Sequence, residues 1–284
     1  MGTKMRSSLP ASTLLLAAVL LSAGASATSR SEGPGAPAAK PRGSEAGAAS
    51  AAKPDAGGCQ RAGFRVLLDV GHSAQVPGAT SARGVPEYEF NLRLGQAIEK
   101  TLLRAGFRSA SLLITPGAAR AGLFARVERA NAWPADLVIS VHHDSVPEWF
   151  LETWTHAGRE ARFSDRFAGH SLFVSFANGE AQASVLFAQL LGRELKLQGL
   201  RFTPHYTRPD MDWRRRELVD PETGVYRYDQ LVVLRDTKVP TILFEAGSII
   251  NRDEELLMSS PERQAKIAAA VTDAVRLFCA ARAQ

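Results

Sequence analysis

From Phe64 onward, short apolar runs alternate with amphipathic segments. Apolar runs of strand length predict buried strands, whereas apolar residues at helical spacing predict helices with one buried face. Ser184 is expected to cap one of these helices and Gly199 to end it, while Pro261 is expected to start the last helix. The expected strands are residues 64–70, 111–116, 136–144, 170–176 and 241–248, and the expected helices are residues 90–105, 121–133, 184–199 and 261–280.

This alternation predicts an α/β fold: a single domain with a twisted, mostly parallel or mixed sheet and helices on both faces. Residues 59–284 are enough for one compact domain with a sizeable core. In such sheets, functional sites form just beyond the carboxyl ends of the strands. Residues that end the predicted strands are therefore the first candidates for chemistry.

Residues 1–27 have the features of a secretory signal peptide. They begin with basic residues, continue with an apolar stretch over 14–21, and end with small residues at Ala25 and Ala27. The apolar stretch is shorter than the ~20 residues that a spanning helix needs. We therefore expect export, a periplasmic or secreted location, and no stable membrane insertion after cleavage; an uncleaved anchor is the alternative.

Residues 28–58 consist mainly of Ala, Gly, Pro and Ser, without aromatic or branched aliphatic side chains. Such a segment cannot bury enough apolar surface to order itself, so we expect a disordered linker. The net charge of the chain is +5. A basic chain is able to bind nucleic acid or another anionic polymer, but export excludes nucleic acid as the partner and favours an anionic cell-envelope polymer; a merely well-charged surface is the alternative.

Two cysteines, Cys59 and Cys279, flank the predicted domain. In an oxidising compartment they are able to form a disulfide that ties the two ends together. Two buried free thiols are the alternative, because sequence does not give the distance between them.

Histidine and glutamate end several of the predicted strands. His72 follows the first strand, His142 and His143 end "VISVHHD", and Glu245 lies in "TILFE". A catalytic zinc site needs three protein ligands and an open position, and an unligated carboxylate nearby is able to act as general base. His72 and His142 are candidate ligands, and "GVPEYEFN" offers a third through Glu87 or Glu89. Because His142 and His143 are neighbours on a strand, only one of them is expected to face the metal.

Together, "LLDVGHS", "EYEFN", "SVHHDS" and "ILFEAGSIINRDEE" resemble the motifs of the zinc-dependent N-acetylmuramoyl-L-alanine amidases of the type-3 family. The matches occur in the family's order over nearly the whole domain. The resemblance implies that His72, Glu87 and His142 bind Zn²⁺ and that Glu245 is the catalytic carboxylate. It selects Glu87 over Glu89 because Glu87 stands four residues before Asn91.

The activity that the resemblance implies is hydrolysis of the amide between the lactyl group of N-acetylmuramic acid and L-alanine of the peptidoglycan stem peptide, in cell-wall remodelling. The expected partners are peptidoglycan and an envelope activator protein, and the expected oligomeric state is a monomer. A zinc peptidase or amide hydrolase with another envelope substrate is one alternative. A non-catalytic peptidoglycan-binding module is another.

Two long stretches mix aromatic residues with arginine: residues 148–169 and 201–235. Such residues are suited to sugar stacking and to binding stem-peptide carboxylates, so we expect both stretches to form substrate surface. The alternative is basic surface loops without substrate contact. Some members of the family carry a self-blocking helix in this part of the chain, so Glu148 or Glu152 is a candidate to reach the metal from the first stretch.

Overall fold

The computed structural model describes residues 58–117 and 119–284. The predicted signal peptide (1–27) and nearly all of the predicted linker (28–58) lie outside the described residues, so both stay predictions. No helix in the described part of the chain is long and apolar enough to cross a membrane.

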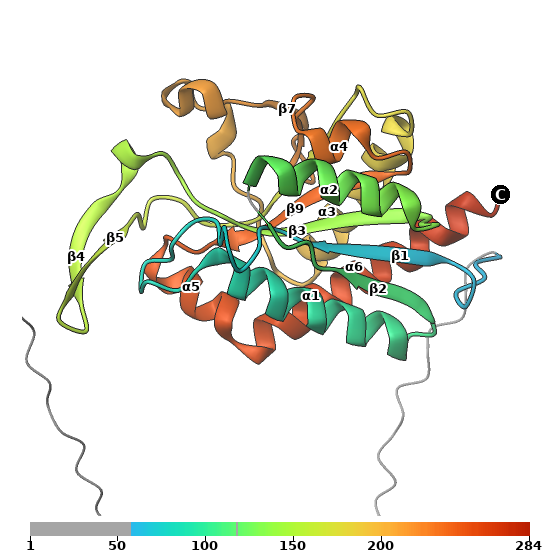
Figure 1. The fold of residues 1–284 in the computed structure, drawn as a ribbon, viewed down its shortest axis with the longest axis horizontal. Coiled ribbons are helices and arrows are strands. Elements are labelled where there is room, and N and C mark those ends of the chain that lie inside the picture. Colours follow the sequence, from blue (N-terminus) through green and yellow to red (C-terminus); the bar gives the residue numbers. More distant parts are fainter. Residues whose placement is uncertain (1–57, 118) are drawn as a thin grey trace, which may run out of the picture. The chain divides into compact units, whose positions relative to one another are not determined.

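A seven-stranded mixed sheet forms the centre of the domain, in the order β2-β1-β3-β9-β6-β8-β7 (Figure 1). The strands β2, β1, β3 and β9 are parallel, β6 is antiparallel to β9, and β7 is antiparallel to β8. The predicted fold class is confirmed. The strands are β1 (Arg65–Val70), β2 (Ser109–Leu113), β3 (Leu137–Asp144), β4 (Glu152–His156), β5 (Arg159–Phe163), β6 (Ser171–Val174), β7 (Glu217–Asp220), β8 (Val225–Arg227) and β9 (Thr241–Ser248).

Helices cover both faces of this sheet, with α1 and α6 on one face and α2 and α4 on the other (Figure 1). On the first face Phe90, Phe187 and Phe278, from α1, α3 and α6, belong to the largest buried cluster together with Phe244 of β9. The helices are α1 (Glu87–Arg104), α2 (Ala119–Ala132), α3 (Ala181–Leu197), α4 (Val232–Asp236), α5 (Arg252–Ser259) and α6 (Pro261–Arg282), with short 3-10 turns η1 (Glu148–Phe150), η2 (His205–Thr207) and η3 (Pro209–Arg214).

Strand β3 shows why the sequences of the central strands are uninterrupted apolar runs. Ile139 and Val141 belong to the cluster on the α1 side, while Val138 belongs to the cluster beneath α2. A strand that is buried on both faces needs apolar residues at successive positions. The run ends where the strand reaches the edge of the sheet at His142, which places polar chemistry at the carboxyl end.

The predicted role of Ser184 as a helix cap is wrong. Helix α3 begins at Ala181, and Ser184 lies inside it, donating from Oγ to the Glu180 carbonyl (3.0 Å) and accepting from the Thr241 N–H (2.9 Å). The hydroxyl therefore connects the helix to β9 instead of starting it. Gly199, with φ of +77°, follows the helix end as expected.

Both long stretches contain regular structure that the sequence pattern does not predict. Strands β4 and β5 form an antiparallel hairpin within 148–169, turning at Ala157 and Gly158, which both have positive φ. Strands β7 and β8 within 201–235 extend the main sheet at its edge. These strands are too short for an alternation of apolar and polar residues to identify them in the sequence.

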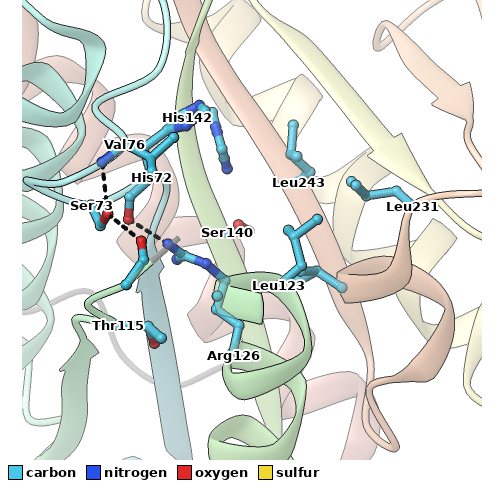
Figure 2. A pocket seen from close by; sticks show the side chains of 13 residues that line it. His72, Ser73, Val76, Thr115, Leu123, Arg126, Ser140, His142, Leu231 and Leu243 are labelled. Atoms are coloured by element: carbon cyan, nitrogen blue, oxygen red, sulfur yellow. Dashed lines mark hydrogen bonds between the residues drawn. The ribbon is translucent and has the colours of Figure 1, made fainter. Parts of the chain in front are cut away.

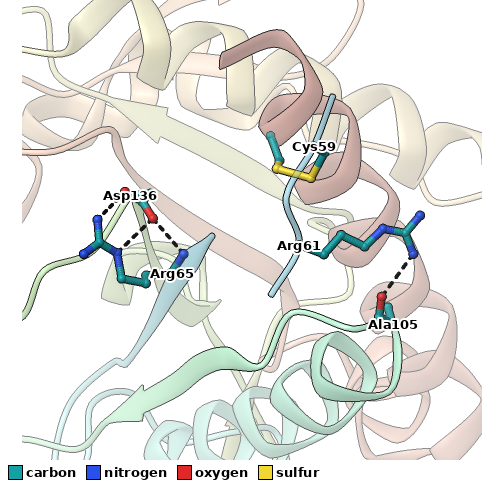
Figure 3. The surroundings of a disulfide bond; sticks show 6 residues. Cys59, Arg61, Arg65, Ala105 and Asp136 are labelled. Carbon is teal, nitrogen blue, oxygen red and sulfur yellow. Dashed lines mark hydrogen bonds and ion pairs between the residues drawn. A yellow bond between two sulfur atoms is a disulfide. The ribbon is translucent and has the colours of Figure 1, made fainter. Parts of the chain in front are cut away.

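Cys59 and Cys279 form a disulfide that joins the segment before β1 to the end of α6 (Figure 3). The alternative of two free thiols is therefore wrong. The bond closes a loop across a sequence separation of 220 residues, almost the whole domain.

Replacing both cysteines with serine is expected to lower the free energy of unfolding by about 3 to 5 kcal/mol, because a long closed loop strongly restricts the unfolded chain. Urea unfolding of the oxidised wild type and the double variant measures this difference. Wild type unfolded in the presence of a reductant should match the double variant. Equal midpoints for oxidised wild type and double variant would contradict a stabilising bridge.

Candidate metal centre

Three of the candidate ligands converge at one edge of the sheet from three different elements. His72 follows β1, Glu87 is the first residue of α1, and His142 lies in β3. Glu87 Oε2 lies 3.0 Å from His72 Nε2, and Glu87 Oε1 lies 3.0 Å from His142 Nδ1. One ligand atom from each residue lies within 4.8 Å of the others. The sequence-based expectation that these residues meet is confirmed.

The donor set fits a catalytic divalent metal. Two imidazoles and a carboxylate are three protein ligands, which leaves a further position for water or substrate. The three ligand atoms are close enough together for one ion to bind all of them. His72 is 31% exposed, while Glu87 is only 5% exposed, so the cluster opens to solvent on the His72 side.

The structure distinguishes the two glutamates of "EYEFN" by burial. Glu87 is buried and Glu89 is exposed. Burial raises the pKa of the Glu87 carboxyl, but hydrogen bonds from His142 and His72 and their charges outweigh burial and hold this pKa well below its usual range. The Ala79 N–H also donates to Oε2 (3.1 Å). Glu87 is therefore a carboxylate that is fixed in position.

Asn91 links Glu87 to the strands that carry the histidines. Its Nδ2 donates to Glu87 Oε1 (3.1 Å) and to the Gly71 carbonyl (3.1 Å), and its Oδ1 accepts from His143 Nδ1 (2.8 Å). Burial lowers the pKa of His143 to about 3, so this imidazole is neutral. His142 and His143 thus have separate roles, with His142 in the cluster and His143 behind it holding Asn91.

Two glycines make room for the ligands. A Cβ on Gly71 would lie 2.5 Å from the His142 ring, and a Cβ on Gly78 would lie 2.5 Å from Glu87 Oε2 and 2.6 Å from His72 Cδ2. Such approaches require the ligands to shift. The glycine in "DVGH" is therefore required by the imidazole that lies over it.

A Gly71→Ala variant is expected to lower the affinity of the site for a divalent metal such as Zn²⁺ by about 10- to 100-fold, the range typical when the residues that orient metal ligands are changed. Competition with a chromophoric chelator measures the affinity. Gly179→Ala is the matched control, because a Cβ at Gly179 meets nothing within 4 Å. Wild-type affinity in Gly71→Ala would contradict the close packing at this position.

Arg126 holds the end of β1, a role that sequence reasoning missed. Its guanidinium, almost fully buried, donates to Asp69 Oδ1 and to the carbonyls of Val70 and His72. His72 has φ of +64°, a left-handed conformation that is uncommon outside glycine and costs free energy. The bond to its carbonyl helps to maintain that conformation. A charged residue on the sheet-facing side of α2 is the signal that could have identified Arg126.

Glu245 lies on β9 beside the cluster and is not one of its members. It is the register partner of His142, so the two side chains project from the same face of the sheet. Its Oε2 is buried and has no hydrogen-bond partner among the described residues. Burial, followed by the charges of Asp144 and Glu87, raises the pKa of Glu245 well above its usual value, and Arg214 opposes this rise.

The remaining candidates lie outside the cluster. Residues 148–169 contain the single 3-10 turn η1 and the β4-β5 hairpin instead of a blocking helix. Glu148 pairs with Arg162 at 3.1 Å, and neither Glu148 nor Glu152 is a member of the cluster, so the expectation that one of them reaches the metal is wrong. His156 stacks on Trp154, with ring centroids 5.2 Å apart. His170 and His205 are buried and are not members of the cluster.

A cavity of about 210 Å³ opens beside the two histidines, between the sheet and helices α2 and α4 (Figure 2). Most of its wall is apolar, and Arg126 and Ser140 line its deeper part. This side of the centre therefore suits an uncharged group. The apolar lining residues include Leu123, Leu231, Val233 and Leu243.

Comparison with known proteins gives consistent matches. A family model described as N-acetylmuramoyl-L-alanine amidase matches residues 66–276. N-acetylmuramoyl-L-alanine amidase Rv3717 of Mycobacterium tuberculosis is 25% identical over 243 residues, which cover 78% of this chain and 89% of that protein. The crystal structure of the N-acetylmuramyl-L-alanine amidase Ami1 from Mycobacterium smegmatis has a TM-score of 0.58 at 20% identity, covering 77% of this chain and 98% of that one. The CwlD amidase from Clostridioides difficile, solved in complex with the GerS lipoprotein, has a TM-score of 0.54 at 18% identity, covering 76% and 98%.

Proposed function

The chain belongs to the N-acetylmuramoyl-L-alanine amidase family, and we propose that it cuts the bond between the lactyl group of N-acetylmuramic acid and L-alanine with one zinc ion held by His72, Glu87 and His142. The observation that carries this proposal is the convergence of the three ligand atoms within 4.8 Å, with Glu245 on the adjacent strand. Imidazole and carboxylate donors suit zinc. Bound there, zinc would supply Lewis acidity that polarises the scissile carbonyl and lowers the pKa of water towards ~7.

Glu245 transfers the proton during the reaction. Its carboxylate takes a proton from the attacking water and passes it to the amide nitrogen of L-alanine as the bond to the lactyl carbonyl breaks. Its unpaired Oε2 and its position beside His142 leave it free for this role. The other side chains hold the geometry: Asn91 orients Glu87, and Arg126 holds the backbone of His72.

We also propose that the protein is exported and acts in cell-wall remodelling. The predicted signal peptide over residues 1–27 supports export, and so does the disulfide, since such bonds persist in oxidising compartments. An activator protein from the envelope fits this setting, because the related CwlD amidase was solved with a lipoprotein. A monomer stays the expected state.

Mass analysis of purified peptidoglycan after digestion tests the reaction. The zinc-loaded wild type should release intact stem peptides with a free L-alanine amino group, leaving muramic acid with an unsubstituted lactyl carboxylate. Peptides cut within the stem would instead indicate a peptidase. Binding to peptidoglycan without release would indicate a non-catalytic module, and either outcome would overturn the proposal.

A further inference from the structure

The segment between β6 and β9 brings one arginine to the edge of the metal centre. Arg214, the last residue of η3, lies with Nη2 3.2 Å from the Tyr206 hydroxyl and 3.3 Å from Asp144 Oδ1. Asp144 ends β3, two residues after His142. The guanidinium therefore lies at the carboxyl edge of the strand that carries a metal ligand.

The surroundings of Arg214 fix its position. The Tyr206 hydroxyl donates to Asp144 Oδ1 (2.7 Å), and the Tyr206 carbonyl accepts from the Arg216 N–H (2.8 Å). The guanidinium carbon of Arg214 lies 5.7 Å from the centroid of the Tyr206 ring, which is almost fully buried. The arginine is thus supported by an ordered network of hydrogen bonds and is not a mobile surface side chain.

Several donors of Arg214 are not used by this network. The side chain is 22% exposed, and Nη2 makes the hydrogen bonds that connect its guanidinium to the described residues. A guanidinium has five N–H donors, which leaves those of Nε and Nη1 to donate to a carboxylate. Glu245 and Arg214 are close enough for the charge of each to act on the other.

The residues that flank Arg214 in η3 belong to a surface with other chemistry than the cavity beside the two histidines. A hollow of about 550 Å³ adjoins η3, and its wall includes Trp213, Arg215 and Arg216 together with the carboxylates of Glu217 and Asp229. Arg216 stacks on Tyr228, with its guanidinium carbon 3.8 Å from the ring centroid. This hollow is charged and aromatic, whereas the cavity beside His72 and His142 is largely apolar. The substrate is divided in the same way, because the scissile amide joins an uncharged sugar ether to a peptide that carries carboxylates.

We propose that Arg214 binds the first carboxylate of the stem peptide beyond L-alanine and so makes the enzyme selective for stem peptides whose second residue keeps that carboxylate unamidated. The contact also sets the direction of the substrate, with the peptide towards η3 and the sugar towards the apolar cavity. This inference rests on the proposed function, and it identifies Arg214 as the side chain with which the enzyme distinguishes one stem peptide from another.

Two synthetic substrates test the inference: N-acetylmuramoyl tripeptides whose second residue is either D-glutamate or its α-amide, D-isoglutamine. Zinc-loaded wild type should cleave the free acid with a kcat/KM about 10- to 100-fold higher than the amide, expressed mainly in KM, as expected for a charge-assisted bond. Arg214→Gln should bring this ratio close to one and leave cleavage of the amide within about threefold of wild type. Arg214→Lys, which keeps the positive charge but not the planar guanidinium, should retain part of the preference.

Arg159→Gln, which removes an exposed guanidinium from β5, is the matched control and should keep the wild-type ratio. The inference is overturned if wild type shows no preference, if Arg214→Gln keeps it, or if both substrates lose kcat equally, since the last result indicates only support of Asp144. Zinc content and thermal unfolding of each variant show whether it is folded. If Arg214→Gln is not folded, the substrate preference of Arg214→Lys tests the inference in its place. If zinc-loaded wild type cleaves neither substrate, the proposed function itself is wrong.

Discussion

Replacing Glu245 with glutamine is expected to lower kcat for peptidoglycan cleavage by about 10²- to 10⁴-fold, the usual contribution of a positioned general base. Glutamine keeps the size of the side chain and removes the group that takes the proton. Zinc content should stay at the wild-type level, because Glu245 is not a member of the ligand cluster. Dye release from labelled peptidoglycan together with elemental analysis of the same samples measures both quantities.

Glu160→Gln is the control for this experiment, because Glu160 lies exposed on β5. It should behave as wild type. Near-normal cleavage by Glu245→Gln would show that another group moves the proton. A variant that loses zinc along with activity would show that Glu245 is a ligand and not a base.

Replacing Glu87 with alanine is expected to reduce bound zinc from about one ion per chain to a trace and cleavage to the limit of detection. The carboxylate contacts both histidines at 3.0 Å, and without it two imidazoles remain, which is one fewer than a catalytic zinc site uses. Asn91 also loses the acceptor at Glu87 Oε1, so the link from α1 to the strands weakens.

Glu89→Ala provides the matched control on the same helix, since Glu89 is exposed and removal of its carboxylate should affect neither zinc nor rate. Equilibrium dialysis followed by elemental analysis gives the stoichiometry for both variants. Full zinc occupancy in Glu87→Ala, or its loss in Glu89→Ala, would show that the second ligand is wrongly assigned.

The sequence predicts the centre well where chemistry coincides with the ends of strands. His72 and His142 follow apolar runs that are buried on both faces, and parallel strands bring their carboxyl ends to one edge of the sheet. Sequence spacing alone left Glu87 and Glu89 as alternatives. The structure separates them because α1 begins at Glu87 and turns Glu89 towards solvent.

The features that sequence reasoning missed depend on contacts between distant segments. Arg126 looks like an ordinary helix arginine until α2 packs on the sheet and buries its guanidinium against the end of β1. Gly78 reads as a turn residue, although its missing side chain makes room for Glu87 and His72. Arg214 contacts Asp144 at the end of β3 only because the chain brings η3 next to that strand end, 70 residues away in the sequence. None of these contacts follows from periodicity along the chain.

The metal requirement is tested most directly by measuring the release of stem peptides from purified peptidoglycan by wild-type protein before and after removal of its metal. We expect a strong chelator, once removed by dialysis, to leave a folded protein that releases nothing. One equivalent of zinc should then restore the starting rate, with one ion found per chain. Release of intact stem peptides at an unchanged rate by protein that elemental analysis shows to be free of metal would contradict the zinc centre.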